Sequence, residues 1–580
     1  MARKTGPDGP KLQIREINGK FYAYTSTSRM IDGKKKTINE CVGRYDPDTG
    51  VVIPKKPRKS KEEYARIRAE MNPAVNFSKI GSRSYGATYL MDQIQRRICL
   101  GEDLQRSYGL SAKAIMTCAM ALAINPGPFS SIIDTFSNTY LRDLYGIEAN
   151  VDSGAMSEFT YNLGNCSECA DDFFSYRVKR CNGLVAWDTT TNSTYSNVGG
   201  LAEWGQNKDG EDLKVVKKGM ATDFRGIPLM YRFYPGSLSD LATVDRLQED
   251  LERYGRTDIL HVMDRGFCSG FNIHNLISKN RSFVIPAKSG SKAVKTILTE
   301  FKKTSEKESK VYDGHAYTVW KTEIGLRLSE RTSVDGSHAY DFTYVQDEGH
   351  ASEGVMTAYV CYDSKKYSDE VQSRELLIDY LAEYAENMDE ADPLNAFRKR
   401  AGRAIKYFDI RQEGRKVILT VKKNARSFSD NRAGMFVMLC SRDVSWELMM
   451  ASYDARRLTE QAFDTEKERD RRLRSGNPVT VEGRYLILFV AQIILAEIRA
   501  MLRENNSDSK YSVESLLAIL STLNVLEYKG QRGLSEVTKN VRRVYELFDM
   551  EVPKEPLYHV QMFDPANLMF PVEQGKSLLG

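Results

Sequence analysis

Two kinds of hydrophobic pattern divide the N-terminal third of the chain. Residues 11–53 alternate polar and apolar side chains around the turn signals NGK, DGK and DPDTG, which predicts a small β module. From Tyr85 to Val178 the apolar residues recur three and four positions apart, as in AKAIMTCAMALAI. This spacing predicts a helical domain.

The next stretch alternates short apolar runs with helical patterns. The runs GLVAWDTT, LKVVKKGMATDF, GIPLMYRFYPG, DILHVMDRGF and RSFVIPA predict five strands. Helical patterns, DLATVDRLQEDLERYG and SGFNIHNLISKN, come before and after the fourth run. Three consecutive strands followed by helix, strand, helix and strand predict an α/β core of RNase H-like fold, a mixed sheet flanked by helices.

The rest of the chain completes the expected organisation. Between residues 288 and 432, alternating segments surround a helical stretch from Ser368 to Asp392, and after them GMFVMLCS predicts one more strand. Two helices are expected at Ser445 to Leu473 and Arg484 to Arg503, and the region from Tyr511 is expected to be helical with a loose tail. The predicted domains are a basic β module (1–57), a helical DNA-binding domain (58–178), the first part of the RNase H-like core (179–287), a β-rich insertion (288–432), the second part of the core (433–505) and a C-terminal helical region (506–580).

Composition places the protein among soluble multidomain chains. Of its 580 residues, 28% are charged and 41% hydrophobic. Nine scattered cysteines predict reduced thiols rather than a disulfide framework, and Cys166 and Cys169 are expected to be two helical thiols because no second pair completes a zinc site. The N-terminus lacks a secretory signal, and the apolar run Leu486 to Ala496 is too short for a membrane span. We expect a cytoplasmic protein without membrane association.

Positive charge is concentrated at the N-terminus. The net charge is +5, yet residues 1–60 contain 14 Lys and Arg against 6 Asp and Glu. This excess predicts contact with a polyanion such as DNA, and a solvated basic tail is the alternative. The candidate phosphate contacts are Lys34, Lys35, Lys36, Lys55, Lys56, Arg58 and Lys59.

Two aspartates end apolar strands. Asp188 follows LVAW and Asp264 follows ILHVM, so each carboxylate is expected at the C-terminal end of a strand, where α/β sheets commonly bind ligands. A turn or helix cap is the alternative for either residue alone.

A charged helix carries a third acid. At about 100° per residue, Tyr453, Arg456, Glu460 and Lys467 lie within about 60° of one another on the expected helix. These four side chains can therefore contact one ligand. The opposite side is expected to face the core through Leu448, Ala455, Leu458 and Ala462. A solvated charged face with incidental ion pairs is the alternative.

The pattern Y-x2-R-x3-E-x6-K, preceded by WDTTT and DRGF, resembles the signature of DDE insertion-sequence transposases, and more narrowly insertion-sequence families four and sixteen-thirty-four. The resemblance extends to the segment PGSLSD. It implies that Asp188, Asp264 and Glu460 are a catalytic triad holding two Mg²⁺ (or Mn²⁺) ions. It further implies that Tyr453, Arg456 and Lys467 contact the backbone of the transposon end. In some relatives a tryptophan of the inserted domain stacks on a flipped base, a role that Trp320 would take here.

The expected function is therefore that of a DNA transposase acting as a homodimer on double-stranded DNA. It would bind terminal inverted repeats, hydrolyse the ends with two metals and join the 3′-hydroxyl ends to target DNA in a prokaryotic cell. No Walker loop or dinucleotide fingerprint occurs, so no nucleotide cofactor is expected. The alternatives are a transposase-derived DNA-binding protein without catalysis and another RNase H-like nuclease, such as a resolvase.

Overall fold

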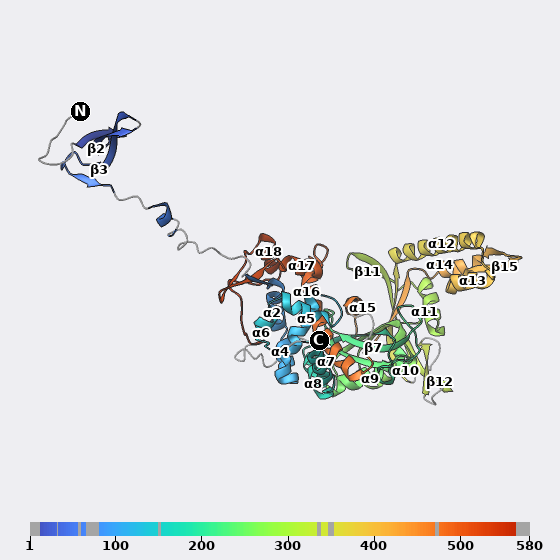
Figure 1. Cartoon of the computed structure of the whole chain (residues 1–580). Helices are drawn as coiled ribbons and strands as arrows, with labels where there is room; N and C mark the ends of the chain where they lie inside the picture. The colour runs from blue at the N-terminus through green and yellow to red at the C-terminus, as the bar shows by residue number, and fades with distance from the viewer. Residues whose placement is uncertain are drawn as a thin grey trace. The chain divides into compact units, whose positions relative to one another are not determined.

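The computed structural model describes residues 12–31, 33–55, 60–64, 66, 80–148, 152–332, 338–345, 353–469 and 475–563. The chain forms two compact units, Met1–Ile80 and Gly81–Gly580 (Figure 1).

The first unit is a four-stranded antiparallel sheet in the order β1-β2-β3-β4, as the alternating pattern predicts. Its core is small, because Ala23 is the only fully buried hydrophobic residue among those described in this unit. Four of the seven candidate phosphate contacts lie here, and Lys56, Arg58 and Lys59 lie outside the described residues. The strands are β1 (Leu12–Ile17), β2 (Lys20–Ile31), β3 (Lys34–Tyr45) and β4 (Val52–Pro54).

A buried helix, α16 (Pro478–Glu504), forms the centre of the second unit. Two helical stretches, Leu100–Ile124 and Pro478–Glu504, are long and apolar enough to span a membrane by composition, but 94% of the apolar window of the latter is buried inside the protein. Leu486 to Ala496 is thus part of a core helix, as predicted. Around α16 lie α2 (Gly86–Arg97), α3 (Leu100–Tyr108), α4 (Ala112–Ile124), α5 (Ser131–Asn138), α6 (Leu141–Tyr145), α7 (Ser153–Gly164) and α8 (Ser167–Lys179).

Helices α7 and α16 cross with their backbones in contact. A Cβ atom on Gly483 would lie 1.8 Å from the carbonyl oxygen of Thr160, and one on Gly164 would lie 1.8 Å from that of Val479. Only glycine fits at either position, since any side chain would overlap the opposing backbone. This crossing attaches the helical region to the core helix.

The sheet of the second unit contains the five strands predicted from the apolar runs. Their order is β8-β7-β6-β9-β10; β6, β7 and β8 pair antiparallel, whereas β9 pairs parallel with both β6 and β10. The two predicted helices are α9 (Asp240–Arg253) and α10 (Gly270–Ser278). The strands are β6 (Leu184–Thr194), β7 (Lys214–Thr222), β8 (Pro228–Pro235), β9 (Leu260–Met263) and β10 (Phe283–Pro286).

Strands from the predicted insertion extend this same sheet. The strand predicted at GMFVMLCS is β17 (Met435–Cys440), which pairs antiparallel with β10 on one side and β14 (Val355–Asp363) on the other. Beyond β14 the sheet continues through β12 (His315–Thr332) to β11 (Glu308–Tyr312), and β13 (His338–Tyr344) pairs with β12. Helix α11 (Lys292–Lys303) packs against β13 and β14.

A second small core lies within the insertion. Helices α12 (Ser364–Asn387), α13 (Pro393–Ala401) and α14 (Lys423–Asp430) surround the hairpin of β15 (Phe408–Glu413) and β16 (Lys416–Val421). Phe397 and Phe408 are fully buried in this cluster. Figure 1 shows it at the end of the second unit opposite α2 and α6.

The C-terminal region is mixed rather than wholly helical. It contains α17 (Val513–Leu520) and α18 (Lys539–Leu547), and between them the hairpin of β18 (Asn524–Tyr528) and β19 (Gln531–Leu534). β18 also pairs with β5 (Gly81–Ser84), so the two ends of this unit meet in one small sheet. The sequence expectation of helices was wrong for the hairpin.

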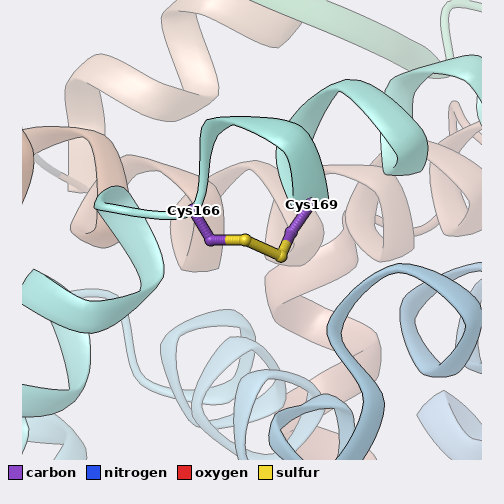
Figure 2. Close-up of a disulfide and its surroundings, with 2 residues drawn as sticks. All are labelled: Cys166 and Cys169. Carbon is purple, nitrogen blue, oxygen red and sulfur yellow. A yellow bond between two sulfur atoms is a disulfide. The ribbon is translucent and has the colours of Figure 1, made fainter.

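The expectation of two free thiols at Cys166 and Cys169 was also wrong. The two residues form a disulfide at the start of α8 (Figure 2). Cys166 is the N-cap and Cys169 follows three residues later, which brings their Cα atoms to 5.3 Å, within the range that a disulfide spans. The other seven cysteines are free, as predicted.

Candidate active site

Strands β6 and β9 bring two aspartates to neighbouring positions. Leu184 to Trp187 of β6 pair in parallel with Leu260 to Met263 of β9, and Trp187 lies opposite Met263. Asp188 and Asp264 are the next residues on each strand, so both emerge where the pairing of β6 with β9 ends. All eleven residues of β6 are buried, and its sequence changes at this point from apolar to polar.

Asp188 is the more enclosed of the two acids. It is 8% exposed, and its Oδ1 accepts a hydrogen bond from the backbone N–H of Thr189 at 2.8 Å. Burial raises the pKa of Asp188 to about 6, although the positive charge of Lys208 opposes this rise. The Asp264 carboxylate raises the pKa of Asp188 further, as expected for two acids at one site.

The first turn of α9 holds β6 on both sides of Asp188. Trp187 Nε1 donates to Thr243 Oγ1 at 3.1 Å, and Thr189 Oγ1 donates to Asp240 Oδ1 at 2.8 Å. Lys217 Nζ also donates to Asp240 Oδ1, at 2.7 Å. The side chains before and after the candidate catalytic aspartate are therefore both fixed to one helix.

Helix α15 (Trp446–Arg469) brings the third acid to this edge. It packs across β6, β7, β9 and β10, and it is one uninterrupted helix over its described residues, as predicted. Ala455 and Ala462 are buried as expected, but Leu448 and Leu458 are only partly buried. Met449, Ser452 and Thr459 are buried instead, which rotates the core-facing side toward the charged stripe by about 60° on the helical wheel. Arg456 is consequently buried.

Arg456 joins two of the three acids. Its Nη1 donates to Glu460 Oε1 at 2.9 Å and lies 3.7 Å from Asp264 Oδ1. The guanidinium carbon also lies 5.4 Å from the ring centre of Tyr453. Burial opposes the charge of Arg456, but Asp264, Tyr453 and Glu460 outweigh burial and raise its pKa. Two residues of the predicted stripe, Arg456 and Glu460, are thus linked to Asp264 at the end of β9.

A known protein family matches the part of the sequence that contains this site. The family described as "Transposase DDE domain" matches residues 180–494, more than half of the chain, and this stretch includes all three acids. The chain belongs to this family of DDE transposases.

A solved structure with detectable similarity is the piggyBac transposase in a synaptic complex with hairpin DNA. The similarity covers 75% of the DDE transposase described here and 70% of that chain, with 9% sequence identity and a TM-score of 0.29. We draw no functional conclusion from a likeness at this level. No curated protein sequence matches the transposase.

The carboxylates of the transposase have the ligand chemistry of a magnesium site, but they are not grouped as the ligands of a bound ion would be. Hard divalent cations prefer carboxylate oxygens, which Asp188, Asp264 and Glu460 supply. Among the described residues, no three His, Cys, Asp or Glu side chains are grouped closely enough to hold a metal. Arg456 instead supplies the positive charge beside Asp264 and Glu460.

Lys467 and Tyr453, two further residues predicted to contact the DNA backbone, differ in exposure and in their interaction partners. The Lys467 Nζ forms an ion pair with Asp209 Oδ1 at 2.7 Å, and its side chain is 20% exposed. Tyr453 is half-buried, and burial raises its pKa. Lys208, which precedes the partner of Lys467, donates through Nζ to the carbonyl of Thr189.

Sequence reasoning missed the supporting residues Lys208, Asp209, Lys217 and Asp240. The first three have no distinctive sequence context. Asp240 ends the segment PGSLSD, which was part of the family resemblance, so a signal was present without an assigned role. Its position in the first turn of α9 explains why it reaches Thr189.

The remaining predicted site residues lie elsewhere. Lys34, Lys35 and Lys36 are exposed on β3 of the first unit. Trp320, on β12, is 5% exposed and its Nε1 donates to Glu306 Oε2 at 3.4 Å. Its ring is therefore enclosed in the core in this structure, and its stacking on a base stays a prediction.

A cleft of about 900 Å³ opens beside Asp264. Asp264 and Tyr453 line it together with basic side chains from the insertion, Lys366, Lys406 and Arg432. The cleft therefore joins one candidate catalytic acid to cationic groups suited to a phosphate backbone.

Proposed function

We propose that this DDE transposase binds the terminal inverted repeats of an insertion sequence, cleaves the ends and joins the 3′-hydroxyls to target DNA. The observation that carries the proposal is the position of Asp188 and Asp264 at adjacent strand ends, together with the link from Asp264 to Glu460 through Arg456. The strand order β8-β7-β6-β9-β10, with three antiparallel strands followed by two parallel ones, supports an RNase H-like core.

Asp188, Asp264 and Glu460 are the proposed ligands of two Mg²⁺ or Mn²⁺ ions. Such ions supply an activated water or 3′-hydroxyl and stabilise the leaving oxygen. The enclosed carboxylate of Asp188 favours this role, because burial raises its pKa to about 6 and a nearby cation would offset that cost. Lys208 and Asp240 keep this part of β6 in place.

Arg456, Lys467 and Tyr453 are the proposed contacts to the DNA backbone. Arg456 Nε is buried and has no hydrogen-bond partner among the described residues, so this donor would bind a phosphate oxygen once the side chain turns toward the DNA. When a phosphate oxygen pairs with the Arg456 guanidinium, the carboxylates of Glu460 and Asp264 lose this group as their ion-pair partner. DNA binding and metal binding would therefore reinforce each other.

The proposed assembly is a homodimer that pairs two transposon ends, one end for each subunit. Basic residues of the first unit, including Lys34 and Lys36, and the helical region from residue 81 would bind the end sequence, while the catalytic edge contacts the backbone. The proposed location is the nucleoid in the cytoplasm of a prokaryotic cell.

A cleavage assay tests the proposal. A duplex carrying the terminal repeat of the element is incubated with Mg²⁺ and the native protein, Glu460→Gln, or Glu447→Gln. Glu447 is a matched control because it lies on the same helix but pairs with Lys310, away from the acids. We expect nicks at the end with the native protein and the control, and loss of nicking with binding retained for Glu460→Gln.

Two results would contradict the proposal. Binding without cleavage by the native protein, in Mg²⁺ and in Mn²⁺, would favour a transposase-derived DNA-binding protein. Cleavage that persists in Glu460→Gln would place the chemistry at other residues.

A further inference from the structure

Two strands of the first unit extend well beyond their neighbours. β1 pairs with β2 only as far as Thr25, and β4 pairs with β3 only at Gly43 to Tyr45. Between these limits, the segments 26–31 and 34–39 pair, among the described residues, only with each other. We call these two segments the ribbon. All their residues are exposed, so neither face of the ribbon packs on the described core.

The pairing register assigns each ribbon side chain to a face. Residues directly opposite each other in an antiparallel pair share a face, and successive residues alternate. Arg29 lies opposite Lys36 and Ile31 opposite Lys34, so these four residues share one face, called here the basic face. Thr27 and Ile38 continue it toward the base of the ribbon.

The other face is mostly polar and uncharged. It carries Ser26 opposite Asn39, Ser28 opposite Thr37, and Met30 opposite Lys35. The Ser26 hydroxyl donates to Asn39 Oδ1 at 2.5 Å, which agrees with this assignment. The three successive lysines are therefore not equivalent, because Lys34 and Lys36 share the basic face and Lys35 lies on the other.

The charges on the basic face destabilise the ribbon when no partner is bound to it. Arg29 and Lys36 are like charges directly opposite each other, which destabilises a strand pair. No ion pair joins Arg29, Lys34 or Lys36 to a carboxylate of a described residue. Ile31 is 38% and Ile38 is 40% exposed on the same face. An anionic partner with apolar surface would relieve the repulsion and cover the isoleucines.

We propose that the ribbon lies in a groove of double-stranded DNA with its basic face toward the duplex. The choice of DNA rests on the proposed function, and the face assignment rests on the strand register. The major groove, about 12 Å wide, admits a two-stranded ribbon. Six residues of strand span roughly 20 Å, enough for several phosphates. Arg29, Lys34 and Lys36 contact phosphates, and Ile31 and Ile38 contact sugars or thymine methyl groups.

The test compares Lys36→Gln with Lys35→Gln in the full-length protein. Both changes remove one charge from neighbouring exposed positions, so diffuse electrostatic attraction would weaken equally. DNA affinity is measured by fluorescence anisotropy on a labelled terminal-repeat duplex over a series of salt concentrations. Circular dichroism of each variant confirms that the sheet is retained.

We expect Lys36→Gln to reduce the slope of log K against log salt by about 0.9 and to weaken binding roughly eightfold at 0.1 M salt. Lys35→Gln should change the affinity by less than about twofold, since one exposed charge away from the contact contributes little. Arg29→Gln should behave like Lys36→Gln.

Equal losses for Lys35→Gln and Lys36→Gln, or no loss for either, would overturn the proposal. So would binding of the native protein to anionic lipid vesicles, with the same Lys36 dependence, in place of duplex DNA. Cleavage is scored in the same samples at saturating protein. If the native protein never cleaves but the Lys36 effect is present, the catalytic proposal fails and the ribbon proposal stands.

Discussion

At the level of single residues, Arg456 is buried and pairs with both Asp264 and Glu460. The helical wheel placed Arg456 on an open charged stripe with Glu460. The structure buries Arg456 because α15 lies across four strands and its core-facing side includes Thr459 and Ser452. Small polar residues were not counted as core in the sequence interpretation. A pattern of apolar residues therefore located the helix correctly and its orientation only approximately.

Removal of the Arg456 charge tests its position between two acids. In Arg456→Gln, Asp264 and Glu460 lose their shared cation, so Mn²⁺ should bind the DNA-free protein more tightly, roughly tenfold for about 1.4 kcal/mol. The affinity for the terminal-repeat duplex should fall. Isothermal titration with Mn²⁺ measures the first effect. Unchanged or weaker Mn²⁺ binding would show that Arg456 does not compete with the metal.

Asp240 supports the catalytic edge through Thr189 and Lys217. Asp240→Ala removes both acceptor contacts and should reduce the single-turnover cleavage rate roughly 10- to 100-fold, with little change in DNA affinity. Asp240→Asn keeps an acceptor oxygen and should recover most of the rate. Equal losses in the two variants, or a loss explained by a lower melting temperature, would argue against a positioning role.

At the level of elements, local patterns were sufficient for most strands and helices of the core. The strands that end at Asp188 and Asp264 were found because each is a short apolar run next to a polar residue. The hairpin of β18 and β19 was missed, because one of its strands pairs with β5, more than 430 residues earlier in the chain. Likewise, the sequence could not show that β12 and β14 extend the core sheet, since the pairing of β14 with β17 and of β12 with β14 is set by long-range contacts.

The crossing of α7 and α16 depends on the absence of a side chain. Gly483→Ala would ordinarily favour a helix, but here the new Cβ would lie 1.8 Å from the Thr160 carbonyl oxygen. We expect the free energy of unfolding to fall by about 2 kcal/mol or more, seen as a lower melting temperature. Gly290→Ala is the control, because nothing lies within 4 Å of its Cβ position. Equal melting temperatures for the two variants would contradict the close crossing.

At the level of the whole molecule, the excess of basic residues before residue 60 belongs to a compact unit of its own. Composition predicted this separation of charge, and alternation predicted its strands. Neither could predict that one helix of the second unit, α16, packs against helices α2, α4 and α7 as well as strand β8. That arrangement brings together chain segments distant in sequence, which local periodicity does not encode.

A partly buried acid on α16 makes the stability of the second unit depend on pH. Burial raises the pKa of Glu482 from 4.5 to about 7. The folded state is therefore favoured most below pH 4.5, and this contribution is lost as the pH rises through 7. Glu482→Gln, which stays neutral, should have the same melting temperature as the native protein near pH 4.5 and a higher one at pH 8. The free energy of unfolding at pH 8 should be higher in the variant by up to about 3 kcal/mol.

The control for this pH effect is Glu514→Gln, a change at an exposed glutamate on α17, which should follow the native protein at both pH values. Melting temperatures from thermal denaturation give the comparison. If Glu482→Gln shows the same difference from the native protein at pH 4.5 and pH 8, the acid does not titrate as described.

The most direct test of the central claim is strand joining. A pre-cleaved terminal-repeat duplex with a labelled 3′-hydroxyl end is incubated with target plasmid, Mg²⁺ and the native protein, Asp188→Asn or Asp264→Asn, and joined products are resolved on a denaturing gel. The account predicts labelled donor–target joints with the native protein and none with either variant, while all three bind the duplex. If the native protein cleaves uncut ends but forms no joints from the pre-cleaved duplex, the protein is a nuclease rather than a transposase, and joints formed by either variant would contradict the assigned catalytic acids.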